Sequence, residues 1–271
     1  MSTPASPIGI FDSGLGGLTV VREVMRQLPN ERIIYFGDTA RVPYGPKSPD
    51  TVRRYSHEIS AYLTSQDVKA VIVACNTATA HALPMLREEI RVPVIGVVDP
   101  GARAAVAASR RQELGVIGTA GTIGSGAYER AIRALAPGAH IVARACPLFV
   151  PLVEEGWVDR DATRLIAREY LQPLKEAGVD TVVLGCTHYP LLKPVLAETL
   201  GGDVVLIDSA HETAAEVASL LSARGLLAPE LDAGARPRHR FIASDAPAHF
   251  LRLGQRFLGS SIECVETLTL G

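Results

Sequence analysis

The sequence predicts an α/β protein with two similar lobes, each built on a parallel-rich sheet flanked by helices. Short, almost continuously apolar runs alternate with longer segments in which apolar residues recur every three or four positions. Continuously apolar strands are typical of parallel sheets that helices cover on both faces. Two of these runs end alike, with Cys75 and Cys186 each followed by polar residues. The repeated ending favours two related lobes over a single sheet.

Eight short apolar runs are predicted as strands. They are residues 8–11, 32–36, 70–74, 94–98, 114–118, 141–143, 181–184 and 204–207. Helices are predicted between them where apolar residues share one face, as at positions 18, 21, 25 and 28 and at positions 52, 55, 59 and 62. Ser48 before Pro49 predicts one helix start, and Ser209 with Glu212 predicts a capping box at another.

The first lobe is predicted to comprise residues 1–98 and 208–271, with the end of the chain returning to it, and to carry Asp12 and Cys75. The second lobe is predicted to cover residues 99–207 and to carry Cys186 and His188. Ligands of α/β sheets bind at the carboxyl ends of the strands, where both cysteines are predicted to lie. We therefore expect the active site in the cleft between the lobes.

The bulk composition excludes several classes of function. A net charge of -2 over 271 residues leaves no electrostatic footprint for nucleic acid or an anionic membrane. No apolar stretch reaches the roughly 18 residues of a transmembrane helix. The start of the chain, from Met1, lacks the basic and apolar regions of a signal peptide, so we expect a cytoplasmic protein. The four cysteines show no CxxC pair and no disulfide spacing, so free thiols are expected.

Two glycine-containing loops are candidate binding segments. The first, residues 12–17, follows a predicted strand and opens a helix, so its backbone N–H groups can meet an anion. It lacks the lysine of a P-loop and the glycine spacing of a dinucleotide-binding loop. Asp12 has a simpler alternative role as the cap of the following helix. The second loop, residues 43–46, is by itself an ordinary turn.

Cys75 and Cys186 are candidate acid/base groups because each lies between a buried strand and a predicted helix start. The helix dipole there is expected to lower the thiol pKa and to favour the thiolate. Asn76 and Thr77 either bind a charged group of a ligand or cap the helix. His188, two residues after Cys186, either tunes that thiol or is structural. For any single cysteine the plain alternative is a small buried apolar residue.

Two equivalent thiols in two related lobes suit proton exchange on both faces of one carbon. A racemase must remove a proton from one face and return a proton to the other, equally well in both directions. One base and one acid that exchange roles are the minimal solution. A zinc site would need two more ligands beside Cys186 and His188, and no spaced partner pair is present. A serine or cysteine hydrolase uses a single nucleophile, which leaves the second thiol unexplained.

Four segments resemble the signature segments of bacterial glutamate racemases, in the aspartate/glutamate racemase superfamily. They are residues 12–17, 43–45, 74–78 and 185–190, and the pairs at 118–119 and 122–123 add to the match. The resemblance spans about residues 8–221. It implies interconversion of L- and D-glutamate without pyridoxal phosphate, metal or any other cofactor. D-glutamate would then feed peptidoglycan synthesis and cell-wall biogenesis.

The resemblance also assigns roles to residues. It implies that Cys75 and Cys186 are the catalytic thiols, with Asp12 assisting Cys75 and His188 assisting Cys186. Cys75 is expected to take the proton from D-glutamate, and Cys186 from L-glutamate. The expected substrate-binding residues are Asp12, Ser13, Tyr44, Gly45, Asn76, Thr77, Thr119, Thr122, Thr187 and His188.

Glutamate is the expected small-molecule partner, and a homodimer is left open as the assembly. Two other functions also stay open at this point. One is an aspartate or hydantoin racemase of the same superfamily, which substrate profiling would reveal. The other is a non-catalytic, two-lobed amino-acid binding protein, which would have no need of paired cysteines.

Overall fold

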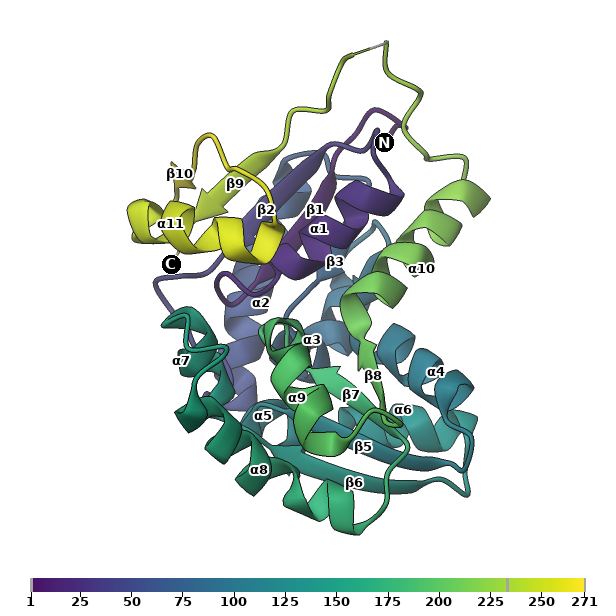
Figure 1. Ribbon diagram of the computed structural model, residues 1–271. Coiled ribbons are helices and arrows are strands. Elements are labelled where there is room, and N and C mark those ends of the chain that lie inside the picture. Colours follow the sequence, from purple (N-terminus) through teal and green to yellow (C-terminus); the bar gives the residue numbers. More distant parts are fainter. Residues whose placement is uncertain (1, 233, 271) are drawn as a thin grey trace.

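The computed structural model describes residues 2–232 and 234–270, and it contains two separate parallel sheets flanked by helices (Figure 1). The expectation that the chain does not start with a signal peptide concerns a segment whose first residue, Met1, lies outside the described residues. Every strand pairing in both sheets is parallel. The predicted α/β class with parallel sheets is therefore confirmed.

The first sheet has six strands in the order β10-β9-β2-β1-β3-β4. Their bounds are β1 (Ile8–Asp12), β2 (Ile33–Gly37), β3 (Ala70–Val73), β4 (Val94–Gly96), β9 (Arg240–Ala243) and β10 (Glu266–Thr267). The last two strands were not among the eight predicted ones. They extend the sheet beyond β2, so the end of the chain returns to the first lobe as expected.

The second sheet has four strands in the order β6-β5-β7-β8. Their bounds are β5 (Glu113–Gly118), β6 (His140–Ala145), β7 (Thr181–Gly185) and β8 (Val205–Asp208). In each sheet the first strand lies between the second and the third, and the fourth lies beyond the third. This shared order confirms the prediction of two similar lobes.

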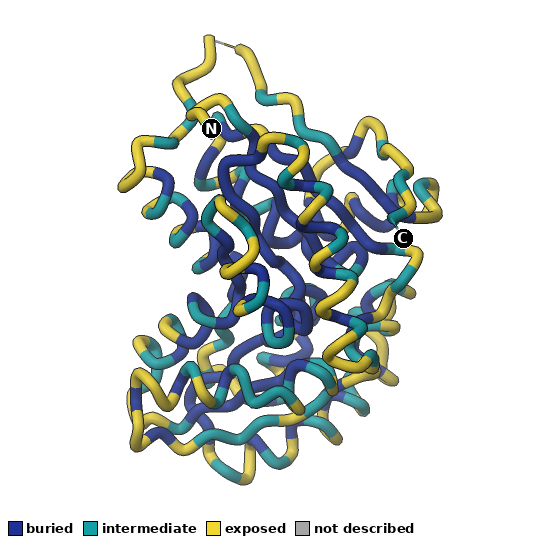
Figure 2. The backbone as a smooth tube through the Cα atoms, turned by 180° about the vertical axis from the view of Figure 1, so that it is seen from behind, coloured by how far each residue is buried: buried dark blue, intermediate teal, exposed yellow. Residues whose placement is uncertain are grey.

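Helices cover both faces of the first sheet. Because successive residues of a strand point to opposite faces, each strand contributes side chains to the core on either side. These helices are α1 (Leu18–Gln27), α2 (Pro49–Ser65), α3 (Asn76–Glu89), α10 (Ser209–Ala223) and α11 (Pro247–Leu258). Ile8 and Ile10 of β1 belong to the core that contains α1, α10 and α11. Phe11 of the same strand belongs to the core beneath α2 and α3. Buried segments, drawn dark blue, run through the middle of the molecule (Figure 2).

Two predicted helix starts have different outcomes. Ser48 caps α2 by accepting the backbone N–H of Thr51, as predicted. The capping box predicted at Ser209 is wrong. The cap of α10 is Asp208, whose carboxylate accepts the N–H of Ala210 at 3.0 Å, and Ser209 is the first helical residue. A carboxylate at the end of β8 reaches the free N–H groups one position earlier than the serine does.

The second sheet is also covered on both faces. The remaining helices are α4 (Val98–Ala108), α5 (Ala120–Gly124), α6 (Ala127–Leu135), α7 (Phe149–Glu154), α8 (Asp161–Glu176), the 3-10 helix η1 (Tyr189–Leu192) and α9 (Lys193–Leu200). One face packs against α4 and α6, whose buried residues include Ala102 and Ile132. The other packs against α8 and α9, through residues such as Leu171 and Leu196.

The chain crosses between the sheets twice, from β4 into α4 and from β8 into α10. β1 to β4 share one sheet with β9 and β10. Strand membership therefore supports a first lobe of residues 1–98 and 208–271 and a second lobe of residues 99–207, except that Asp208 still belongs to β8 of the second sheet. We keep these boundaries as a proposal. Within the described residues, no helix is both long and apolar enough to cross a membrane.

Candidate active site

The carboxyl ends of four strands meet at one cavity between the two lobes. β1 and β3 are neighbours in the first sheet, and β5 and β7 are neighbours in the second. In the first sheet, β2 lies on one side of this pair and β4 on the other, and in the second sheet β6 and β8 do the same. Such a reversal of strand order is a topological switch point, where the strand ends leave a crevice for a ligand. The cavity is lined by Ser13, Val42, Pro43, Tyr44, Gly45, Cys75, Asn76, Thr77, Thr119, Val150, Cys186, Thr187 and His188.

Both predicted thiols therefore lie on the wall of one cavity, along with most of the expected substrate-binding residues. Asp12 and Thr122 are not among its lining residues. Val42, Pro43 and Val150 also line the cavity, although none of them was among the expected substrate-binding residues. Val150 belongs to α7, far in sequence from either cysteine, and the sequence contains no signal for it.

Cys75 lies directly before α3 and occupies the N-cap position of that helix. Its sulfur accepts the N–H of Ala78 at 3.4 Å and donates to Oγ of Ser13 at 3.7 Å. Burial raises the pKa of the Cys75 thiol to about 12, and the nearby carboxylate of Asp12 adds to the increase. The N–H of Ala78 at the helix start does lower this pKa, but desolvation outweighs it, so the expected net decrease is wrong.

Cys186 follows β7, but it does not cap an α-helix. Two residues separate it from the 3-10 helix η1, which begins at Tyr189. Its sulfur lies 4.0 Å from Nδ1 of His188. The two cysteine segments therefore differ: Cys75 contacts a helix N-terminus, whereas Cys186 contacts an imidazole.

His188 is almost fully buried and has a partner on each side. Its Nε2 lies 3.0 Å from Oε1 of Glu154 at the end of α7, and the ring meets Phe257 of α11 edge to face at 5.1 Å between centroids. Burial lowers the pKa of His188, but Cys186 and Glu154 outweigh burial and raise it to about 10. Both contacts therefore favour the protonated form of the imidazole beside the Cys186 sulfur. Neither Glu154 nor Phe257 could be found from the sequence, since neither adjoins a motif.

Asp12 lies behind the cavity wall and connects the two lobes. Its carboxylate accepts the N–H of Gly14 at 2.9 Å and the hydroxyl of Thr187 at 3.4 Å. Burial raises the pKa of Asp12, although the charge of His188 and these hydrogen bonds oppose the rise. Its contact with Thr187 therefore orients a residue that lines the cavity, and its contact with Gly14 holds the residue next to Ser13, which lines the cavity as well.

Three threonines join the lobes at another side of the cavity. Oγ1 of Thr77 lies 2.8 Å from that of Thr119 and 3.2 Å from that of Thr122, and Thr119 donates to Thr122 at 3.0 Å. The N–H of Gly121 also donates to the carbonyl of Gly45 at 2.9 Å, across the same boundary. Thr122 thus contacts the lining threonines from behind.

Tyr44 is held in the cavity wall by a buried carboxylate. Its hydroxyl donates to Oδ2 of Asp38 at 2.5 Å, and Asp38 also accepts from Arg41 at 2.7 Å and from Ser244 at 2.8 Å. Burial and the charge of Asp38 raise the pKa of Tyr44, so the phenol stays protonated. Asp38 follows β2 and was not singled out in the sequence, where it resembles any loop aspartate.

The two remaining cysteines lie outside the cavity. Cys146 is buried at the end of β6, and Cys264 is exposed. Neither belongs to the lining. Across residues 2–232 and 234–270, no three His, Cys, Asp or Glu side chains converge as a metal site would require.

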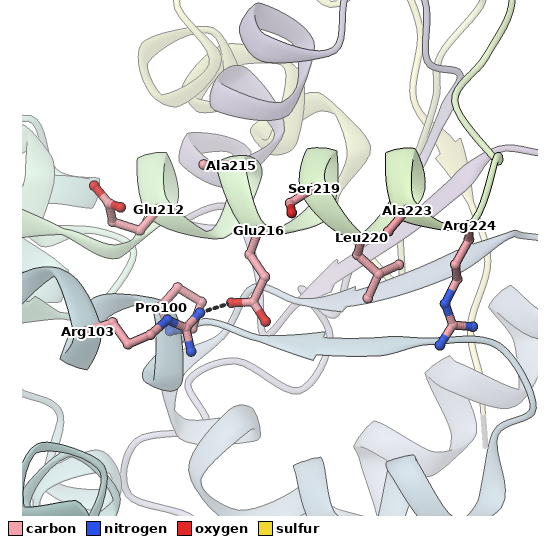
Figure 3. A pocket seen from close by; sticks show the side chains of 9 residues that line it. All are labelled: Pro100, Arg103, Glu212, Ala215, Glu216, Ser219, Leu220, Ala223 and Arg224. Carbon is pink, nitrogen blue, oxygen red and sulfur yellow. Dashed lines mark hydrogen bonds and ion pairs between the residues drawn. The ribbon is translucent and has the colours of Figure 1, made fainter. Parts of the chain in front are cut away.

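A larger hollow lies elsewhere, along α4 and α10 (Figure 3). Its volume is about 500 Å³, against about 30 Å³ for the cavity with the cysteines. Arg103 and Glu216 form an ion pair there, and Glu212 and Arg224 border it. Its lining includes no cysteine or histidine, so we place the candidate active site in the smaller cavity, which Cys75, Cys186 and His188 line.

Comparison with known proteins assigns the family. Residues 8–217 match the family model described as Asp/Glu/Hydantoin racemase. A glutamate racemase from Geobacter metallireducens is 55% identical over 267 residues, or 98% of each chain. A solved glutamate racemase from Bacillus anthracis matches with a TM-score of 0.93 and 42% identity over 97% of each chain. A glutamate racemase from Francisella tularensis, solved in complex with D-glutamate, matches with a TM-score of 0.91 and 38% identity over 98% of each chain.

These matches span both sheets and both cysteine segments, and they confirm the resemblance noted in the sequence. The chain belongs to the Asp/Glu/Hydantoin racemase family.

Proposed function

We propose that this protein interconverts L- and D-glutamate without a cofactor, using Cys75 and Cys186 as its two acid/base groups. The observation that carries the proposal is that both thiols line one cavity, each at the end of the third strand of one of two similar sheets. Relatives named glutamate racemase over nearly the whole chain support glutamate as the substrate. The relative bound to D-glutamate supports it further.

The proposed reaction moves one proton off the α-carbon and one proton onto it. With L-glutamate bound, the Cys186 thiolate takes the α-proton, and the electron pair of the broken C–H bond passes into the carboxyl group. The Cys75 thiol then gives its proton to the opposite face, which yields D-glutamate and a Cys75 thiolate. In the reverse direction each sulfur does the opposite, so the pair needs no outside oxidant or reductant.

The unequal surroundings of the sulfurs support this starting state. Nδ1 of His188 lies 4.0 Å from the Cys186 sulfur, and the raised pKa of His188 favours a positive charge beside that sulfur. The raised pKa of about 12 keeps Cys75 protonated and ready to donate. Two thiolates together would be unproductive, since neither could deliver a proton.

Substrate binding is proposed to rest on hydroxyl, amide and backbone N–H groups. No lysine or arginine is among the described residues that line the cavity. Ser13, Thr77, Thr119 and Thr187 supply hydroxyls, and the start of α3 supplies N–H groups to a carboxylate. Asp12 and Thr122 are proposed to act by orienting these residues from behind.

The wider role follows from the product. D-glutamate made in the cytoplasm would supply peptidoglycan synthesis, and we include this role in the proposal. A homodimer is kept as a proposed assembly.

The test is deuterium uptake at the glutamate α-carbon in D₂O, followed by circular dichroism as each enantiomer approaches the racemate. The chain is first dialysed against a chelator, with no pyridoxal phosphate present. We expect full turnover in both directions. An enzyme that regains activity only with zinc, or one that racemises aspartate or a hydantoin but not glutamate, would refute the proposal. Binding of glutamate without exchange would indicate a binding protein instead.

A further inference from the structure

In the side-chain amide of Asn76, the oxygen has a hydrogen-bond partner and the nitrogen has none among the described residues. Asn76 is 3% exposed and lines the cavity, directly after Cys75. Its Oδ1 accepts the hydroxyl of Tyr128 at 2.7 Å. Its Nδ2 is buried and meets no acceptor within residues 2–232 and 234–270. A buried donor without a partner costs free energy, so an unpaired Nδ2 beside a cavity indicates that a ligand supplies its acceptor.

Tyr128 comes from the other lobe. It lies in α6, 1% exposed, in the core between α4 and the second sheet. Burial raises the pKa of Tyr128, so its phenol stays protonated and acts as a donor at ordinary pH. The hydrogen bond from this phenol O–H to Oδ1 of Asn76 stabilises the orientation in which Oδ1 faces Tyr128. The opposite end of the amide, Nδ2, is then the end that meets no acceptor among the described residues.

Two glycines leave room for the Tyr128 ring. A Cβ atom on Gly185 would lie 3.1 Å from Cε2 of Tyr128, and a Cβ atom on Gly101 would lie 3.3 Å from its hydroxyl oxygen. Both separations are tighter than ordinary packing contacts. Gly185 immediately precedes Cys186, as Asn76 immediately follows Cys75. One buried side chain therefore touches both cysteine segments.

We propose that Tyr128 is a positioning residue for substrate recognition, which turns the Asn76 amide so that its N–H₂ group donates to a carboxylate of the substrate. The inference rests on the proposed function, because glutamate supplies the carboxylate. Had the amide been turned the other way, Oδ1 would face the cavity and favour the ammonium group instead. The orientation set by Tyr128 is therefore what decides which charged group of the substrate Asn76 binds.

The test is a double-mutant cycle on the full chain, with kcat and KM measured for both glutamate enantiomers. Tyr128→Phe removes only the hydroxyl, and Asn76→Ala removes the amide. We expect each change to lower kcat/KM by about tenfold or more, the factor for one hydrogen bond to a charged group. Since Tyr128 acts through Asn76, the double variant should match Asn76→Ala to within about twofold.

Tyr189→Phe is the matched control. Tyr189 is fully buried as well, and its hydroxyl donates to the carbonyl of Cys146 at 2.8 Å. Whatever this change costs, the cost should be the same with Asn76 and with Ala at position 76. Additive losses for Tyr128→Phe and Asn76→Ala, like those of the control, would show that Tyr128 is merely structural and would overturn the inference.

Asn76→Asp tests the orientation even if Tyr128→Phe does not fold. Tyr128 would still donate to one carboxylate oxygen, and the other oxygen would face the substrate carboxylate and repel it. We expect kcat/KM below that of Asn76→Ala, and a value equal to it or higher would overturn the inference. A wild-type chain that does not turn over glutamate would instead overturn the proposed function, and with it the ligand assumed here.

Discussion

Nε2 of His188 lies 3.0 Å from Oε1 of Glu154, so the imidazole beside Cys186 is oriented by a carboxylate from α7. Glu154 also helps to raise the pKa of His188. We predict that Glu154→Gln lowers kcat by about tenfold or more, the factor for losing one hydrogen bond to a charged group. The alkaline limb of the activity profile should also move to lower pH, because the imidazolium loses its anionic partner.

Glu155→Gln is the matched control for this change. Glu155 is the next residue in the chain, and it is exposed. Its removal should leave the rate and the pH profile unchanged. A Glu154→Gln enzyme with the wild-type alkaline limb would show that Glu154 does not set the charge of His188.

The raised pKa of His188 also predicts how stability depends on pH. The folded chain keeps this proton up to about pH 10, whereas an unfolded histidine loses it near its ordinary value of about 6.5. The stabilisation is therefore complete below about pH 6.5 and is lost as the pH rises towards 10. Denaturant titrations should give a free energy of unfolding that falls between pH 7 and pH 9.5. The same slope in His188→Asn would contradict the assignment.

Gly16 is predicted to tolerate no side chain. A Cβ atom there would lie 2.5 Å from Nδ1 of His188, and Oγ1 of Thr187 would lie closer still. Gly16→Ala must push these residues away from Cys186, so we expect activity to fall by at least about 10²-fold, the scale of acid/base catalysis. Gly124→Ala is the control, because a Cβ atom at that position meets nothing within 4 Å. Near-normal turnover by Gly16→Ala would show that the lobes approach less closely than described.

Cys146 and Cys264 are predicted to be dispensable for catalysis. Cys146 is buried outside the cavity and Cys264 is exposed. Cys146→Ala should keep most of its activity, with a packing cost on the order of 1 kcal/mol in unfolding free energy. Cys264→Ala should change neither quantity. Loss of turnover by either variant, with the fold intact by circular dichroism, would contradict the two-thiol account.

The architecture could be predicted from the sequence because strands and helices each leave a local pattern of apolar residues. All eight predicted strands are present, and both cysteines lie at strand ends as expected. β9 was missed because residues 240–243 are few and follow a long stretch without apolar periodicity. Its place beside β2 depends on the whole first lobe.

The residues that support the cysteines could not be predicted, because their roles arise only when the lobes pack. Tyr128 resembles any apolar helix residue until α6 brings its hydroxyl to Asn76. Glu154 is one of two adjacent glutamates, and only the fold decides which one meets His188. The pKa of Cys75 was mispredicted for the same reason, since the depth of burial is a tertiary property.

The most direct test of the two-thiol mechanism uses a glutamate analogue with a leaving group on its β-carbon. Elimination of that group needs only the base on one face, so it reports each sulfur separately. We predict that Cys75→Ser processes the L analogue better than the D analogue and that Cys186→Ser does the reverse. The loss on the blocked face should be at least about 10²-fold, because a serine hydroxyl is a far weaker base than a thiolate. Equal impairment of both enantiomers by each variant would contradict the assignment of one thiol to each face.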